Sequence, residues 1–195
     1  MSYRPLQLHL ARWLLTAILG LMVCGSAASQ TYPDKIRGYK VHKANVTVRT
    51  PDSALPSSEN SAEIVLGKPI LYDVGLTAVT FEVGAEITSS DHSGKVEFLT
   101  FSDLKVNGIA VSIDEYTTKF AFKKGQEILL PQPARVNIST LNLARAARNE
   151  LLDPKKKWRL TGTVFVFGKF KKFGFSFKRV VPIVIDAMVE NPVRK

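Results

Sequence analysis

The stretch Gly75–Ser89, with the sequence GLTAVTFEVGAEITS, carries the clearest structural pattern in this chain of 195 residues. Every second residue in its middle is apolar, and these residues are Val79, Phe81, Val83, Ala85 and Ile87. The residues between them are polar or small, which gives a period of two. Such a period is typical of a β-strand with one buried face. The stretch therefore predicts a half-buried strand, and such strands form a core when their sheets stack.

Segments of similar character lie on both sides of this stretch, separated by turn-forming residues. Strands are expected at 42–49, at 64–72 with a break at 67–69, and at 95–106. Asn107-Gly108 is a two-residue turn of the kind that closes a β-hairpin. Short strands with frequent turns indicate a mainly β protein. Further strands are expected at 109–113, 119–122, 127–130, 135–139, 158–167 and 173–185, the last two joined through 168–172.

One segment departs from this pattern and predicts a helix. Thr140–Leu152 is rich in helix-forming residues, Ser139 or Thr140 can cap its start, and Pro154 ends it. Strands and helices do not alternate along the chain, which argues against a parallel βαβ sheet. The sequence predicts an antiparallel β-sandwich of the immunoglobulin or fibronectin III type, with one short helix near 140–152.

The first 28 residues have the features of a secretory signal peptide. They contain Arg4 and Arg12 but no acidic residue, and an apolar run follows at 13–23. A bilayer core requires about 20 apolar residues, so this run is too short to span it. Ser26 and Ala28 occupy the −3 and −1 positions of a cleavage site. We expect cleavage after Ala28 and an exported protein that is periplasmic or secreted.

Two alternatives for this leader remain open. It could stay uncleaved as an anchor, or Cys24 could carry a lipid, although Val23 is larger than the residue that usually precedes such a cysteine. Beyond the leader, 29–40 is expected to be a polar lead-in, 41–187 the sandwich domain and 188–195 a tail. After cleavage the domain has no cysteine, and its 25 basic and 17 acidic residues give a net charge of +8. This charge favours anionic partners.

The sequence contains no recognisable catalytic, cofactor or metal motif. His42 and His92 lie 50 residues apart, and Asp91-His92 is interpreted as a solvated turn rather than as a pair of metal ligands. The neighbouring carboxylates Asp114 and Glu115 would point to opposite faces of a strand. No phosphate-binding glycine loop occurs. We therefore expect no enzyme activity, no cofactor and no metal site.

The segment Pro154–Arg179 is the most unusual part of the chain. It contains nine basic residues and no acidic one. Phe170 lies among lysines at the expected hairpin tip, where an apolar wedge in a cationic ring could dock on an anionic membrane, with each cation contributing about 1 kcal/mol. The residues of this candidate anionic-surface site are Lys169, Phe170, Lys171, Lys172, Lys178 and Arg179. In extended form, Phe165, Phe167, Phe173, Phe175 and Phe177 are expected to share one face. The alternative is that the phenylalanines are core and the lysines a solvated edge.

Four segments of the sequence are similar to those of a known protein family. They are VTFEVGAEITSS, LKVNG, LLPQPARVNIS and WRLTGTVFVFG. Over about 41–187 the sequence resembles the late-embryogenesis-abundant type 2 family, also described as the water-stress and hypersensitive-response (WHy) domain. The resemblance implies a fibronectin-like sandwich without a catalytic site and a role in protection against drying and other stress. Ser89-Ser90 departs from the Asn-Pro usually found after the early strand.

Two functional hypotheses follow. The first is an exported, non-enzymatic domain with a stress-protection or structural role in the cell envelope, as the resemblance implies, with client proteins as its partners. The second is a module that binds anionic lipid, lipopolysaccharide or another polyanion through the basic aromatic hairpin 155–179. Export argues against nucleic acid as a partner. The sequence does not fix the oligomeric state.

Overall fold

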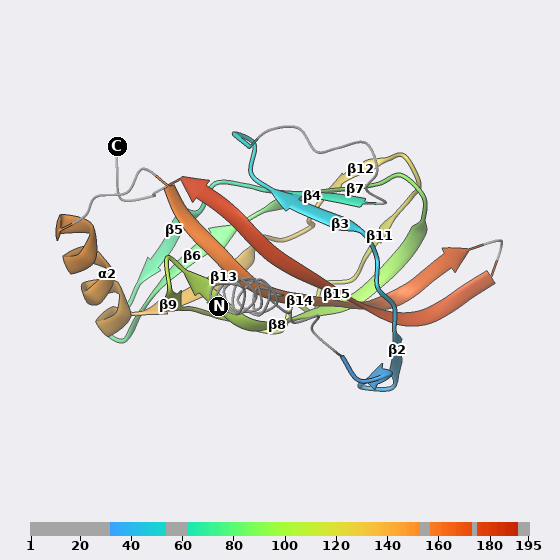
Figure 1. Ribbon diagram of the computed structural model, residues 1–195, viewed down its shortest axis with the longest axis horizontal. Helices are drawn as coiled ribbons and strands as arrows, with labels where there is room; N and C mark the ends of the chain where they lie inside the picture. Colours follow the sequence, from blue (N-terminus) through green and yellow to red (C-terminus); the bar gives the residue numbers. More distant parts are fainter. Residues whose placement is uncertain (1–31, 54–61, 153–156, 173–174, 191–195) are drawn as a thin grey trace, which may run out of the picture. The chain divides into compact units, whose positions relative to one another are not determined.

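A computed structural model describes residues 32–53, 62–152, 157–172 and 175–190 (Figure 1). The residues from Pro33 onward belong to one compact unit, separate from residues 1–32. The predicted leader, with Cys24 and Ala28, lies outside the described residues, as do Lys155, Lys156, Phe173 and most of the tail. Within the described part of the chain, no helix is both long and apolar enough to cross a membrane.

The predicted β-sandwich is confirmed, and its first layer is a seven-stranded sheet. The strand order is β1-β2-β15-β14-β8-β11, and β9 also pairs with β8. The long strands β8, β14 and β15 form its centre (Figure 1). The bounds are β1 Lys35–Ile36, β2 Tyr39–Val41, β8 Ser93–Val106, β9 Ile109–Ala110, β11 Phe120–Phe122, β14 Lys157–Lys172 and β15 Phe175–Glu190.

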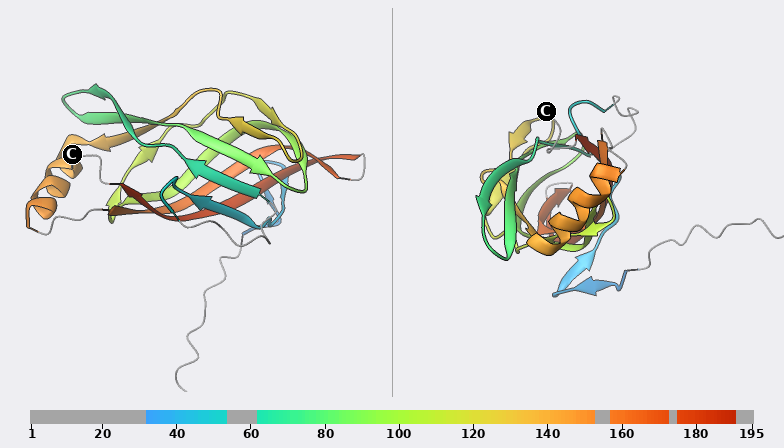
Figure 2. Two further views of the ribbon diagram at one scale, coloured as in Figure 1. Left: turned by 90° about the horizontal axis from the view of Figure 1, so that it is seen from above. Right: turned by 90° about the vertical axis from the view of Figure 1, so that its left-hand side faces the viewer.

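Two four-stranded sheets, ordered β10-β13-β6-β5 and β12-β7-β4-β3, form the second layer (Figure 2). Most strand pairs in the two layers are antiparallel, but β2–β15 and β3–β4 are parallel. The bounds are β3 Val46–Arg49, β4 Ala62–Leu66, β5 Ile70–Val74, β6 Ala78–Val83, β7 Ala85–Ser89, β10 Ser112–Ile113, β12 Glu127–Leu129 and β13 Ala134–Ser139.

The stretch predicted as one strand at 75–89 is two strands that meet at Gly84. The strand β6 pairs with β5 and β13, whereas β7 pairs with β4 and β12. The Gly67 amide donates a 2.9 Å hydrogen bond to the Gly84 carbonyl, and a Cβ on Gly67 would lie 3.3 Å from that oxygen. Glycine at position 67 therefore permits the close backbone approach at which the second layer divides.

The segment predicted as a polar lead-in belongs to the first sheet. The strands β1 and β2 form a hairpin around Arg37 and Gly38, whose φ angles are 49° and 80°. Strand β2 then pairs in parallel with β15 at Arg179 and Val180. The strand expected to begin at His42 begins at Val46, because the residues between cross from the first layer to the second. Strand β15 continues to Glu190, beyond the expected domain end at 187.

The predicted helix is present as α2, Thr140–Leu152. The Ser139 hydroxyl accepts a 3.2 Å hydrogen bond from the Asn142 amide, so Ser139 is the N-cap. The Thr140 hydroxyl donates a 2.9 Å hydrogen bond to the carbonyl of Leu76, which holds the start of the helix beside the end of β5. Leu143 on this helix contributes to the lining of the interior cavity described below.

The register of the β14–β15 hairpin corrects the predicted face of the phenylalanines. Phe167 pairs with Val180 and Phe170 with Phe177, so the odd-numbered residues of one strand share a face with the even-numbered residues of the other. Phe165 and Phe167 therefore lie on the outer face of the sandwich, whereas Phe175 and Phe177 lie on the inner face. The two strands are described up to Lys172 and from Phe175, so the predicted turn 168–172 is part of strand β14.

Candidate functional site

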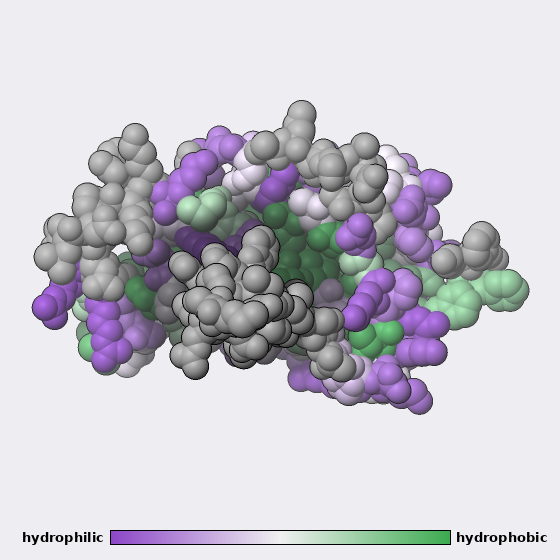
Figure 3. All heavy atoms as spheres, in the orientation of Figure 1, coloured by the Kyte–Doolittle hydropathy of each residue, from purple (hydrophilic) through white to green (hydrophobic). Residues whose placement is uncertain are grey.

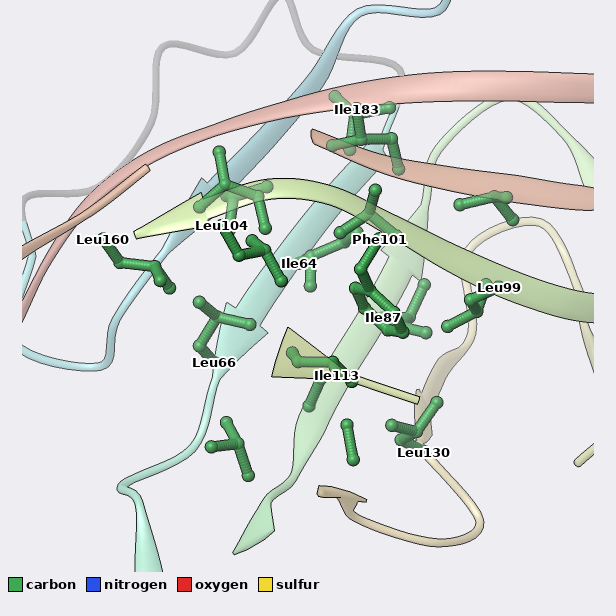
Figure 4. A pocket seen from close by; sticks show the side chains of 18 of the residues that line it. Ile64, Leu66, Ile87, Leu99, Phe101, Leu104, Ile113, Leu130, Leu160 and Ile183 are labelled. Atoms are coloured by element: carbon green, nitrogen blue, oxygen red, sulfur yellow. The ribbon is translucent and has the colours of Figure 1, made fainter. Parts of the chain in front are cut away.

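A cavity of about 510 Å³ lies between the two layers. Figure 4 shows that its labelled side chains come from both layers and point into a common space. Ligand pockets generally have volumes of roughly 300–1,000 Å³. Close-packed protein interiors contain few voids larger than a water molecule. The volume of this cavity therefore falls within the range of ligand pockets.

The second layer leaves this space open because many of its inward residues are small. Ala62, Val83, Gly84, Ala85 and Ala134 line the cavity from this layer and cannot reach across to the first. The space is visible from outside between β3 and β15, where Figure 3 shows hydrophobic side chains in the hollow. A contiguous apolar hollow of this kind makes the cavity the candidate site of the described residues.

At each end of this opening, a hydrogen bond joins β15 to the chain segment that contains β3. The His42 amide donates to the Val180 carbonyl at 2.9 Å, and the Thr50 hydroxyl donates to the Met188 carbonyl at 3.1 Å. Strand β3 lies between these two points. The opening therefore has fixed ends and a middle in which β3 makes no ladder with β15.

The cavity is long. Its lining includes Trp158, near the start of β14, and Phe170, near the end of the same strand. At about 3.3 Å per residue, these two positions are roughly 40 Å apart along the strand. Leu143 of α2 lines the cavity together with Trp158, and Phe177 lines it opposite Phe170. This shape suits an extended chain better than a compact ring system.

The polar side chains of the lining gather toward one end. Among the described residues they are Ser89, His42, His92 and Arg179, and the remaining lining residues are apolar, glycine or Trp158. Arg179 pairs with Gly168 of β14, and the His42 amide bonds to the neighbouring Val180. His92 directly precedes β8, whose first residue, Ser93, pairs with Lys171. All three basic side chains thus belong to the end of the cavity nearest the hairpin turn.

Arg179 is the chemically distinctive residue of this group. It is half-buried, and its guanidinium lies 5.2 Å from the centre of the Phe177 ring. Within the described part of the chain no carboxylate is within salt-bridge distance of Arg179, whereas four other arginines have acidic partners: Arg37 with Glu115, Arg49 with Glu63, Arg135 with Glu82, and Arg159 with Asp186. A partly buried cation without an acidic neighbour is available to an anionic group of a ligand.

The outer face of the same hairpin is closely packed. Tyr39 of β2 meets the Phe167 ring edge-on at 5.2 Å, and Phe167 stacks on Phe98 at 4.4 Å. Phe167 and Val180 are among the most deeply buried side chains described. This outer cluster explains why the segment expected to be a lead-in is ordered as β1 and β2.

A β-bulge places an acidic residue beside this cluster. The register of β8 against β14 shifts between Val96 and Phe98, which brings Glu97 to the outer face next to Phe98. Glu97 accepts a 2.5 Å hydrogen bond from the Tyr39 hydroxyl. Burial, followed by this hydrogen bond, raises the pKa of Tyr39 to about 12. Two predicted anion-binding lysines also contact this group: Lys169 lies 3.9 Å from Glu97, and Lys178 lies 4.3 Å from the centre of the Tyr39 ring.

The structure divides the six residues of the predicted anionic-surface site between two faces. Phe170 and Arg179 line the cavity, whereas Lys169, Lys171 and Lys178 lie on the outer face. The side chain of Lys172 lies outside the described part. Phe170, predicted as an exposed wedge, is half-buried in β14, and its ring centre lies 6.1 Å from that of Phe122.

No sequence pattern predicts a site that contains His42, His92 or Trp158, although all three line the cavity. These residues lie in or next to β2, β8 and β14, which belong to one sheet. The sheet brings them together from distant parts of the sequence, so no local motif predicts their proximity. Among the described residues, no group of three His, Cys, Asp or Glu side chains could hold a metal ion. Glu115 forms a 2.6 Å ion pair with Arg37.

No family model and no curated protein matches the sequence. The chain is similar to a solved crystal structure of a protein from Archaeoglobus fulgidus, with 11% sequence identity and a TM-score of 0.39. The similarity covers 65% of this chain and 94% of that chain. At this TM-score it supports no conclusion about fold or function.

Proposed function

We propose that this protein binds an amphiphile that has an acyl chain and an anionic head. The observation that carries the proposal is a long apolar cavity whose basic side chains, Arg179, His42 and His92, all lie at one end. The acyl chain occupies the body of the cavity, toward Trp158. The anionic head lies at the hairpin end, beside Arg179.

The energetics favour this orientation. Each methylene removed from water contributes about 0.8 kcal/mol, so a long chain supplies most of the binding free energy. An ionised head cannot enter the apolar body without a large desolvation cost. Beside Arg179 the head retains a charge-assisted partner. The single cation therefore sets the direction of the ligand, and the cavity sets its affinity.

This proposal develops the second of the two functional hypotheses and changes its location. The anionic partner is now recognised inside the sandwich rather than by an exposed wedge. Expected export through the leader would make envelope lipids and their fatty acids the available ligands. The first hypothesis, a stress-protection role without a discrete site, stays a prediction, but such a role does not by itself require a cavity.

Trp158 offers a direct test. The chain has two tryptophans, Trp13 and Trp158, so Trp13→Phe leaves the cavity residue as the sole tryptophan. Titration with fatty acids of increasing chain length, followed by Trp158 fluorescence, should show a dissociation constant that falls about fourfold per added methylene until the cavity is filled. Brominated fatty acids should quench the emission. A fluorescence response that is absent, or that does not depend on chain length, would contradict the proposal.

A further inference from the structure

We infer that the free end of the β14–β15 hairpin docks on an anionic lipid bilayer, an inference that rests on the proposed function because it supplies the source of the amphiphile. The hairpin extends past its neighbours at this end. The last β14 residue paired with β8 is Lys171, which pairs with Ser93, whereas the pairing with β15 continues to Lys172 and Phe175. Figure 1 shows this end projecting beyond the other strands.

The two faces of the projecting end differ in chemistry. The inner face carries Phe175 and Phe177, which are 70% and 40% exposed because the second layer does not extend over them. The outer face carries Lys169, Lys171 and Lys178, all exposed. The register fixes this separation, since Phe177 pairs with Phe170 and Lys178 with Lys169. The end is therefore an amphipathic hairpin.

An anionic bilayer is the partner that matches both faces. Exposed aromatic rings partition into the headgroup and acyl boundary, and lysines are attracted to anionic headgroups. The segment Pro154–Arg179 contains no acidic residue, and Glu97, the carboxylate beside the outer-face lysines, lies within ion-pair distance of Lys169. A protein partner would be expected to require a broader apolar patch with hydrogen-bonding groups around it.

The position of the cavity supports the same partner. Arg179 and Phe177, which line its polar end, belong to the strand that carries Phe175. Docking through Phe175 and the lysines thus places the end proposed to hold the anionic head at the membrane surface. A lipid could then enter or leave with its head near the other headgroups throughout.

The test is co-sedimentation of the full chain with vesicles of phosphatidylcholine, with and without phosphatidylglycerol, at low and high salt. Phe175→Ser should weaken binding to anionic vesicles about tenfold, and Lys171→Gln about fivefold. The matched controls are Leu76→Ser, at a leucine that is 98% exposed, and Lys105→Gln, at an exposed lysine of β8 far from the hairpin end. Both controls should bind as the parent does.

The same variants, carried in the Trp13→Phe background, are titrated with a soluble fatty acid. Loss of vesicle binding with an unchanged Trp158 response would support docking as a function separate from the cavity. Equal losses in Phe175→Ser and Leu76→Ser, or no binding of the parent chain to anionic vesicles, would overturn the docking inference even if the cavity binds fatty acid. Salt-sensitive docking through the hairpin without any Trp158 response would overturn the proposed ligand and leave docking in place.

Discussion

Phe170 and Phe177 pair across the β14–β15 hairpin, and both side chains line the interior cavity. Their pairing fixes the identity of every residue on each face of the hairpin. It places Arg179 at the wall of the cavity and Lys178 outside, on the Tyr39 ring. Basic residues adjacent in sequence therefore have different roles: Arg179 faces the proposed ligand, whereas Lys178 packs against the outer cluster.

Replacement of Arg179 by methionine tests the assignment of the anionic head. Removal of a charged hydrogen-bonding partner typically costs about 1.5–3 kcal/mol. We expect Arg179→Met to weaken the binding of a fatty acid at least about tenfold. The binding of the alcohol with the same chain should change little, because it loses no ionic partner. Lys178→Met is the control, and its ratio of acid to alcohol affinity should equal that of the parent. Equal losses for acid and alcohol would contradict the assignment.

Filling the cavity tests the location of the acyl chain. Ala85 of β7 lines the cavity, and its neighbour Glu86 is exposed on the opposite face of the strand. Ala85→Phe should lower the affinity for the longest fatty acid that binds about tenfold, a loss equivalent to roughly two buried methylenes. Glu86→Phe adds the same ring outside and should leave affinity unchanged. Isothermal titration calorimetry measures the affinity of both variants for the fatty acid. Equal losses of affinity in the two variants would show that the acyl chain does not occupy the cavity.

Much of the fold could be predicted because its signals are local. The alternation of apolar residues from Val79 to Ile87 identifies strand residues with one buried face, and Asn107-Gly108 forms the expected hairpin turn, with φ angles of 50° and 81°. The helix has the predicted bounds, Thr140–Leu152. Each of these features depends on residues that are close together in the sequence.

The site could not be predicted because it depends on register and on distant pairing. Residues 168–172 are paired strand instead of the predicted turn, which changes the partner of every residue in the hairpin. A shift of one residue exchanges the two faces of a strand. The sequence pattern therefore predicts one shared face for the phenylalanines of β14 and β15, whereas the register divides them between two faces. The cavity itself depends on small residues from different strands of the second layer, such as Ala62 and Ala134, lining one space, which no local pattern reveals.

Tyr39 is expected to make stability depend on pH in the alkaline range. Its pKa is raised from 10.0 to about 12, chiefly by burial. Because the folded protein retains the phenolic proton more tightly than the unfolded chain, this contribution is fully present below pH 10 and is lost as the pH rises toward 12. Urea denaturation of the parent and of Tyr39→Phe should therefore give free energies of unfolding whose difference changes between these pH values. Tyr72→Phe, at an exposed tyrosine, should show the same dependence of the free energy of unfolding on pH as the parent. If Tyr39→Phe also showed the parent's pH dependence, the expectation would be refuted.

Gly162 is expected to tolerate no side chain, because both its backbone and its surroundings exclude one. Its φ is 151°, and a Cβ would lie 2.5 Å from a methyl carbon and 2.9 Å from the Cα of Leu104. Leu104 is buried among Ile185 and Ala187, so it cannot move away freely. Gly162→Ala should lower the free energy of unfolding by about 2–4 kcal/mol. Gly108→Ala separates the two causes, since Gly108 has a φ of 81° and nothing within 4 Å of its Cβ position. It should cost only about 1 kcal/mol, and equal losses in the two variants would show that backbone strain alone, and not contact with Leu104, requires glycine at 162.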